Sequence, residues 1–239
     1  DEASPALSPN GEFLAWIQGA GKLVVGDSTS LEVQRTLTDG FSAPNFEWAP
    51  DSRWLAYSQE NDDFNNDVFV TRADEDFEPY NLTRHPDDDT NPHWSPDGRK
   101  LSFTSRRQML DETDVYVAWL QREDSQMTKR ERLEAEEAKE EAKKKAEKEK
   151  KKEAKKKAEA DEESKEEEPK EVDGEAEEDD EKEEEDVDPV EIDFEDLPIR
   201  LSRMTRFEGN ERALGWNADS DKIYFNASQG TRLTSGSKG

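Results

Sequence analysis

A ten-residue pattern occurs four times in this chain of 239 residues, and it limits the fold more than any other feature. Each copy begins with a large apolar residue, continues through a four-residue turn, and reaches an aromatic residue nine positions later. The third copy reads WSPDGRKLSF, where Pro96 presets φ for the turn and Asp97 and Gly98 suit the positions that follow. The pattern predicts a tight hairpin in every copy. The four copies begin at Leu7, Trp48, Trp94 and Trp216.

The spacing of the copies predicts a β-propeller. The first two intervals are 41 and 46 residues, and the third is 122 because a low-complexity segment is inserted there. Around the copies, short runs of alternating apolar residues indicate strands of four to six residues. Four such strands in each period of this length are typical of a propeller blade. A β-sandwich with similar hairpins is the alternative, and the fixed nine-residue spacing in four copies argues against it.

We therefore predict an all-β fold: a partial β-propeller of about 3.5 blades, each of four antiparallel strands, with a long charged insertion that is part helical and part disordered. Residues 1–124 form blades 1–3, residues 125–192 form the insertion, and residues 193–239 form the end of blade 3 and the first hairpin of blade 4. The run IRLSRMT takes the place of the fourth strand of blade 3, so the insertion is a loop between its third and fourth strands. In the last copy NADS replaces SPDG, and the missing proline weakens the prediction of that hairpin.

A closed propeller typically has 4–8 blades, which is more than this chain supplies. The chain also begins with Asp1 and not with Met. We expect it to be a fragment or processed form of a longer polypeptide.

The insertion holds 30 acidic and 17 basic residues. Residues 128–160 are mostly Glu, Lys and Ala, which favour helix, and pairs such as Glu140–Lys144 add support. Their alanines form no large apolar seam, so we predict a single solvated helix and no coiled coil. Residues 161–191 are mostly acidic, with Pro and Gly breakers, and we expect disorder there. The insertion is either a tolerated solvated loop, which we favour, or an acidic segment that binds a partner or guards an opening.

Charge and composition exclude several classes of protein. The formal net charge is −28, which repels nucleic acid and anionic membranes, so we expect neither as a partner. No apolar run approaches the ~18 residues that a membrane span needs. The absence of cysteine excludes disulfides, zinc–thiolate sites and a cysteine nucleophile, and it leaves both a cytosolic and an exported location open.

The chain offers few groups for catalysis, and we predict no catalytic, cofactor-binding or metal-binding residue in it. The motifs G-x-S-x-G, H-E-x-x-H and the P-loop do not occur. Of the two histidines, His85 lies in a predicted polar turn and His93 directly precedes Trp94 on a predicted strand. For His93 we favour an inter-blade hydrogen bond or a surface position over a role as ligand or catalytic base.

Two acidic runs have the oxygen ligands that calcium prefers, Asn61–Asp67 and Asp87–Asp89. Both lack the glycine and the final glutamate of a calcium loop, so we interpret them as plain acidic loops. Asp67 and Asp114 each precede an apolar V-[FY]-V strand. We expect these two carboxylates to accept hydrogen bonds from turn amides, which is a structural role.

The repeat x-P-x-[WF]-S-P-D-G-x-x-[IL]-x-[FY] resembles the TolB-type propeller repeat, which also occurs in prolyl-oligopeptidase relatives and in tricorn-type proteases. The phrase VEIDFEDLPIRLSRM (Val190–Met204) follows the Lys/Glu-rich tract. It resembles the tricorn-like serine peptidases of the tail-specific protease class, in which a similar IDF-x-x-[IL]-x-x-R phrase resumes a propeller. The resemblance to propellers covers residues 1–124 and 193–239. Family members also carry a PDZ domain and a protease domain with a serine nucleophile, and neither is found in this sequence.

The resemblance implies a non-catalytic propeller portion that gates or binds peptide substrates for a downstream protease domain. The partners it implies are peptides or unfolded proteins, the remaining propeller, PDZ and protease domains of the parent chain, and a second copy in a homo-oligomer. It implies no cofactor and a cytoplasmic location, with a periplasmic or secreted location as the alternative. Two other functions stay open: a TolB-like protein-binding propeller without enzymatic activity, and the propeller of a prolyl-oligopeptidase-type hydrolase.

Overall fold

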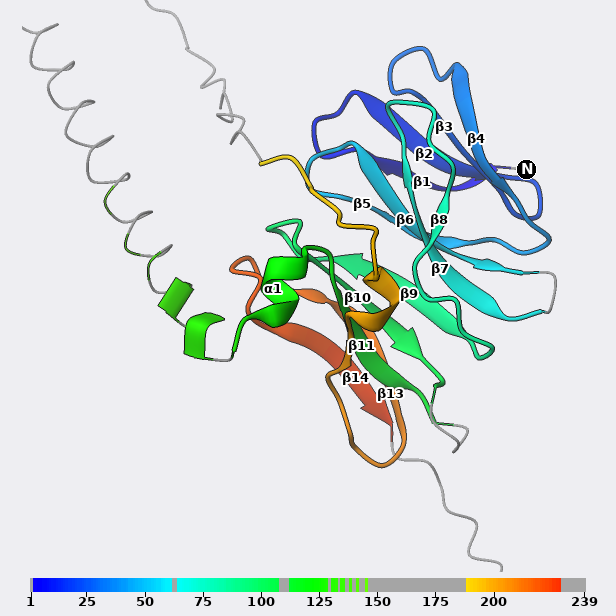
Figure 1. The fold of residues 1–239 in the computed structure, drawn as a ribbon. Coiled ribbons are helices and arrows are strands. Elements are labelled where there is room, and N and C mark those ends of the chain that lie inside the picture. The colour runs from blue at the N-terminus through cyan, green and yellow to red at the C-terminus, as the bar shows by residue number, and fades with distance from the viewer. Residues whose placement is uncertain are drawn as a thin grey trace, which may run out of the picture. The chain divides into compact units, whose positions relative to one another are not determined.

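The computed structural model describes residues 2–61, 64–107, 112–128 and 188–228, together with residues 130–132, 134, 135, 138, 141 and 145. The chain divides into two compact units, one of residues 1–125 and 185–239 and the other of residues 126–184. The described part of the first unit contains four antiparallel sheets, three of four strands and one of two (Figure 1). This is the predicted all-β partial propeller. No helix within the described ranges has the length and apolar character that a membrane crossing requires.

Each four-stranded blade is an antiparallel meander in which consecutive strands pair. Blade 1 consists of β1 (Glu2–Leu7), β2 (Phe13–Gln18), β3 (Lys22–Asp27) and β4 (Val33–Asp39). Blade 2 consists of β5 (Asn45–Trp48), β6 (Trp54–Glu60), β7 (Asn66–Arg72) and β8 (Tyr80–Asn81). Blade 3 consists of β9 (Asp89–Trp94), β10 (Lys100–Ser105), β11 (Asp114–Trp119) and β12 (Leu201–Arg203). The fourth hairpin consists of β13 (Asn210–Trp216) and β14 (Ile223–Ser228). Two short helices, α1 (Arg122–Gln126) and the 3-10 helix η1 (Leu197–Ile199), lie between β11 and β12 in the sequence.

Strand β12 confirms the predicted position of the insertion. It pairs antiparallel with β11, for example Val117 with Ser202, so the chain returns to complete blade 3 after the insertion. Strand β1 was not among the predicted strands. It contains Pro5, and its pairing with β2 shifts between Ala3 and Ala6, so it lacks a regular alternating pattern.

The aromatic residues of the second and third copies are buried between adjacent blades, as predicted. Trp48 and Tyr57 belong to a buried apolar cluster that also contains residues of blade 1. Trp94 and Phe103 belong to a second cluster formed by residues of blades 2 and 3. Large aromatic side chains contribute most of the apolar area at such contacts.

The fourth residue of each repeated turn has a left-handed backbone conformation. Glycine adopts this conformation freely, whereas for serine it costs about 1 kcal/mol of conformational free energy. Where serine occurs, its hydroxyl accepts a hydrogen bond from the blade before: Asn10 N–H donates to Ser52 Oγ and Asp97 N–H to Ser220 Oγ, both at 2.9 Å. These bonds join blade 1 to blade 2, and blade 3 to the fourth hairpin. The four residues are Gly11 (φ 75°), Ser52 (φ 62°), Gly98 (φ 65°) and Ser220 (φ 60°).

At the junction of blades 2 and 3, a returning segment takes the place of this serine hydroxyl. We call residues 188–200 the strap. Its Val190 N–H donates to Asp51 Oδ2 at 2.9 Å, in the turn of blade 2. A Cβ atom added at Gly98 would lie 2.5 Å from Val190 Cγ2. The missing side chain of Gly98 therefore leaves the space that the strap occupies.

The expectation of disorder through residue 191 is wrong for residues 188–191. Val190 is buried, and Leu197 has no exposed surface; both join the apolar cluster of blades 2 and 3. Ile192 and Phe194 pack against the same cluster. Val190, Ile192 and Phe194 stand at alternating positions among acidic residues, and the average composition of the acidic tract concealed them. Residues 161–187 lie outside the described residues.

Replacing Gly98 with serine is expected to lower the free energy of unfolding by about 1–3 kcal/mol, because the new side chain displaces Val190 from the blade junction. Urea unfolding followed by tryptophan fluorescence measures this loss. The matched control is Gly11→Ser, which has a similar φ of 75° and no atom within 4 Å of the added Cβ. Equal losses in the two variants would show that the strap is not held at Gly98.

The second unit begins with a helix start that the sequence predicted near residue 128. Thr128 N–H donates to Glu131 Oε2 at 2.7 Å, and Glu131 N–H donates to Thr128 Oγ1 at 3.3 Å, which is a capping box. Hydrogen bonds from the backbone N–H and from the side chain of Thr128 lower the pKa of the Glu131 carboxyl. Arg130 and Glu134 form an i,i+4 ion pair at 2.7 Å. The described residues from 130 to 145 are helical, and the remainder of the predicted helix lies outside the described residues.

Candidate functional site

The first strands of the blades form a row, and this row is the candidate functional site. Each of β1, β5, β9 and β13 stands at one end of its sheet and pairs with a single strand. Three hydrogen bonds of one kind join neighbours in the row: a tryptophan indole donates to the carbonyl oxygen one residue before the repeated apolar position of the preceding blade. They are Trp48 Nε1 to Ala6 O (3.0 Å), Trp94 Nε1 to Glu47 O (3.2 Å) and Trp216 Nε1 to His93 O (3.2 Å).

Glu47 makes a second connection between β5 and β9. Its Oε2 lies 2.6 Å from His93 Nδ1, and its Oε1 accepts the backbone N–H of Trp94 at 3.0 Å. Both side chains of this histidine–carboxylate pair are partly exposed. The pair can donate and accept hydrogen bonds at the edge of the row.

The strand edges in the row are irregular. Pairing shifts by one residue in β1, β9 and β13. Ser4 and Asn91 stand at equivalent positions three residues before the repeated apolar residue, and both have φ 52°. The exposed Arg212 donates to Asn91 Oδ1 at 2.9 Å, which places a guanidinium beside this bulge. Bulges of this kind redirect side chains and interrupt pairing, and they are common beside functional sites.

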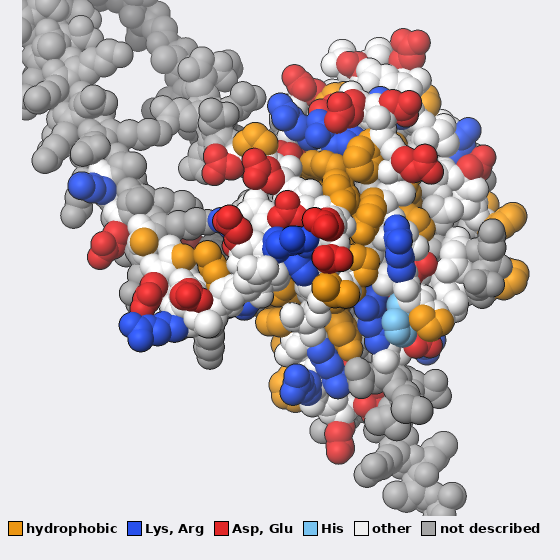
Figure 2. All heavy atoms as spheres, viewed as in Figure 1, with side chains coloured by type: hydrophobic (Ala, Val, Ile, Leu, Met, Phe, Trp, Pro, Cys, Tyr) orange, Lys and Arg blue, Asp and Glu red, His pale blue; other side chains and the backbone are white. Residues whose placement is uncertain are grey.

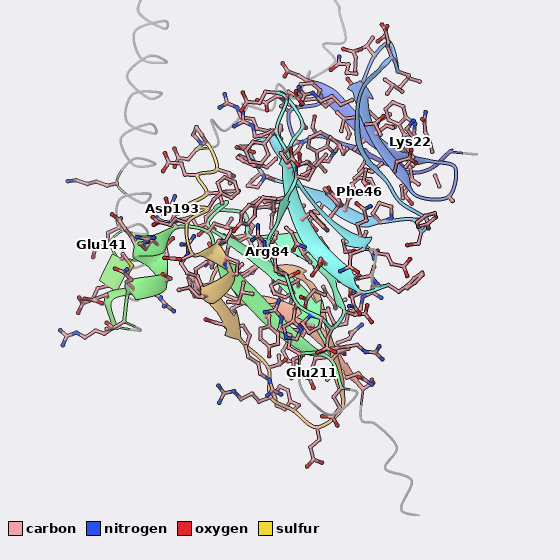
Figure 3. The ribbon with its side chains drawn as sticks, turned by 45° about the vertical axis from the view of Figure 1, so that its right-hand side comes forward. Lys22, Phe46, Arg84, Glu141, Asp193 and Glu211 are labelled. Carbon is pink, nitrogen blue, oxygen red and sulfur yellow. The ribbon has the colours of Figure 1, made fainter. Side chains whose placement is uncertain are left out.

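The strap contacts Arg122, the first residue of α1, on another part of the first unit. Arg122 N–H donates to Asp193 Oδ2 at 2.7 Å, and the Arg122 guanidinium pairs with Glu195 at 3.1 Å and with Asp196 at 3.5 Å. Figure 2 shows acidic and basic side chains meeting in the middle of this face, where Figure 1 places α1. Figure 3 shows Asp193 on the strap, far from Glu211 on β13. The strap is therefore fixed at both the apolar junction and the surface.

Both histidines lie where the sequence placed them. His93 forms an inter-blade hydrogen bond, with Glu47, as expected. His85 lies in the connection between β8 and β9, where its ring accepts Asp87 N–H at 3.2 Å. The backbone N–H of His85 donates to Asp67 Oδ1 at 3.2 Å. His85 thus belongs to a turn, and the structure does not bring it to the row of first strands.

The two acidic runs come together, but hydrogen bonds and ion pairs occupy their carboxylates. Asp88 accepts from the backbone and the side chain of Asn66, each at 3.0 Å. Asp89 has no exposed surface and pairs with Arg107 at 2.7 Å. Asp62 and Asp63 lie outside the described residues. Over the described part of the chain, no group of three or more histidine, aspartate or glutamate side chains is arranged to hold a metal ion.

The expectation for the two strand-leading aspartates holds for one of them. Asp67 accepts the turn amide of His85, together with the Thr83 hydroxyl at 3.1 Å. Asp114 instead pairs with Arg203 at 2.7 Å. Arg203 stands where blade 2 has Asn81, whose side-chain amide donates to Asp67. An arginine at this position reaches the carboxylate directly and replaces the amide donor.

Sequence reasoning missed Glu47, Arg212 and Glu211. The repeat contained a signal for the first: Glu47 precedes Trp48 as His93 precedes Trp94, so the two stand at equivalent positions on neighbouring blades. Adjacent blades place equivalent positions near each other, so a glutamate and a histidine at these positions can form a hydrogen bond. Arg212 and Glu211 had no such signal, because their neighbours come from β9 and β11, far away in the sequence.

No family model matches this chain. A search of the curated proteins also found no match.

Comparison with solved structures shows the fold. The tricorn protease matches with a TM-score of 0.53 and 14% identity, over 89% of this chain and 18% of that chain. The putative TolB from Agrobacterium tumefaciens matches with a TM-score of 0.39 and 21% identity, over 49% of this chain and 42% of its own length. TolB from Acinetobacter baumannii gives 0.40 and 17%, over 48% and 29%. The chain spans less than half the length of each. The likeness to the tricorn protease supports the β-propeller architecture.

Proposed function

We propose that this chain is the non-catalytic propeller portion of a tricorn-like serine peptidase, and that it binds and gates peptide substrates for a downstream protease domain. The observation that carries the proposal is the row of first strands, each with a strand partner on one side only within the described residues. Extended peptides bind such strand edges through main-chain hydrogen bonds, and side chains along the edge provide selectivity.

Two further features support peptide binding at the row. The bulges in β1, β9 and β13 interrupt regular pairing, which suits a weakly held extended ligand better than a permanent strand. Arg212 and the Glu47–His93 pair provide a cation, a carboxylate and an imidazole ring along the same row. A peptide can contact these groups without reaching the buried clusters between the blades.

Replacing Arg212 with alanine tests this function. We expect an unstructured ten-residue peptide with one glutamate, labelled with fluorescein, to bind the full chain with micromolar to millimolar affinity. The Arg212→Ala variant should bind it about two- to fivefold more weakly, because one exposed ion pair contributes about 0.2–1 kcal/mol. Fluorescence anisotropy measures both affinities.

The matched control is Arg35→Ala, which removes the same charge from β4 at the opposite end of the sheet of blade 1. This variant should bind the peptide as the unmodified chain does. Equal weakening by both variants would indicate a nonspecific charge effect. No binding by the unmodified chain would contradict the proposal.

A further inference from the structure

Two carboxyl groups are buried together between blade 3 and the fourth hairpin. Glu211 on β13 has no exposed surface, and Asp114 on β11 is 2% exposed. Asp114 Oδ1 accepts a hydrogen bond from Arg203 at 2.7 Å. Asp114 Oδ2 and both carboxyl oxygens of Glu211 have no hydrogen-bond partner at ordinary distance and angle among the described residues. One arginine therefore faces two buried acids.

The corresponding acids between blades 2 and 3 are compensated. Asp89 stands five residues before Trp94, as Glu211 stands five before Trp216, and Arg107 pairs with it at 2.7 Å. Counted from the same tryptophans, the position of Arg107 corresponds to Gln229, which carries no charge. The fourth hairpin thus repeats the buried acid of blade 3 without repeating its arginine.

The other charged groups on the surrounding strands do not neutralise this additional acid. On β9, Asp89 pairs with Arg107 and His93 with Glu47. On β13, Arg212 is exposed and donates to Asn91. Strand β14 carries no charged residue. The remaining charged groups of these packed strands are Asp114 on β11, Arg203 on β12, and Lys100, which bonds to Ser220 O at the other end of β10.

We propose that Glu211 and Asp114 share one proton, and that loss of this proton as the pH rises loosens the fourth hairpin from blade 3. Two carboxylates that share one arginine cannot both ionise cheaply in a buried site. A protonated Glu211 can donate its O–H to Asp114, which satisfies oxygens that otherwise lack a donor. The same pair lies across the interface, so its protonation bears directly on docking.

Burial is the main cause that raises the pKa of Glu211 above its ordinary value of 4.5. The Thr205 hydroxyl opposes this effect on the pKa, and Asp114 adds to it through a hydrogen bond and charge repulsion. A docked hairpin therefore keeps a proton that a released hairpin loses above pH 4.5. Docking has its full strength below that pH and weakens with rising pH until the docked Glu211 also ionises. Each pH unit within this window changes the opening equilibrium about tenfold.

Hydrogen exchange of the full chain, corrected for the intrinsic effect of pH, tests the proposal. Peptides that cover β13 and β14 should lose protection severalfold or more between pH 5 and pH 8, whereas those of β6 and β7 should keep theirs. Glu211→Gln retains the shape and removes the titration, so its protection should be the same at both pH values. The matched control is Glu208→Gln, an exposed residue on the neighbouring loop, which should behave as the unmodified chain does.

An equal pH response in Glu211→Gln and the unmodified chain would overturn the proposal. So would constant protection of β13 and β14 in the unmodified chain. Titration of the Glu211 carboxyl carbon by NMR in the unmodified chain gives a test that does not depend on the folding of a variant. A midpoint at or below the ordinary glutamate value would also overturn the proposal.

Discussion

Replacing Arg200 with methionine is expected to lower the free energy of unfolding by about 3–5 kcal/mol. Arg200 is buried at the end of the strap. Its guanidinium donates to four carbonyl oxygens, two at the end of β11 and two on the strap. The acceptors are Trp119 O (3.0 Å), Leu120 O (3.1 Å), Glu195 O (2.7 Å) and Asp193 O.

The size of this effect follows from what the substitution leaves behind. Burial lowers the pKa of the Arg200 guanidinium, yet an arginine stays charged in a protein, so these hydrogen bonds are charge-assisted. Methionine fills a similar volume and donates none of them. Four carbonyl oxygens then lose a donor in a place that water reaches poorly, and the strap loses its connection to β11.

Urea unfolding followed by tryptophan fluorescence measures the loss at Arg200. The matched control is Arg206→Met, which makes the same substitution at an exposed position three residues after the end of β12. This control should change stability by less than about 0.5 kcal/mol. A similarly small change for Arg200→Met would mean that the strap does not depend on this guanidinium.

Replacing Trp94 with alanine is expected to cost about 3–5 kcal/mol. Trp94 is 4% exposed and lies in the apolar cluster that joins blades 2 and 3. The substitution creates a cavity at that junction and removes the indole hydrogen bond to Glu47 O. The same urea titration measures the loss.

Two further substitutions separate the parts of the Trp94 effect. Trp94→Phe keeps most of the apolar area and loses the indole donor, so it should cost about 1–2 kcal/mol. Tyr224→Ala removes an aromatic residue that is 58% exposed and should cost less than about 0.5 kcal/mol. Equal losses for Trp94→Ala and Tyr224→Ala would contradict the packing of blade 2 on blade 3.

The motif that resembled tricorn-like peptidases has a physical explanation in the strap. Phe194 packs against the rings of Trp54, Phe77 and Tyr80, with centroids 4.8–5.9 Å away. Leu197 is fully buried, and Arg200 binds the four carbonyl oxygens. The spacing of these three residues is therefore the spacing of the points at which the strap attaches to blades 2 and 3.

The sequence was sufficient to predict the blades, because all strand pairs within a blade except β11–β12 join neighbouring segments and repeat a local pattern. Turn residues and alternating apolar positions are enough to predict such hairpins, and equivalent positions in the repeat placed the insertion between β11 and β12. It did not reveal β1, where Pro5 and a bulge break the alternation, or the start of the strap, where single apolar residues stand in an acidic tract.

The polar contacts between blades follow from the tertiary structure and could not be predicted from the sequence. Glu47 contacts His93 across 46 residues, and the Arg203–Asp114 pair, which Glu211 joins, connects parts of the chain 89 residues apart. These contacts depend on how one sheet stacks on the next and on where an inserted loop returns. Local pattern carries no information on that stacking, because it records the period within a strand and not the partner across the interface.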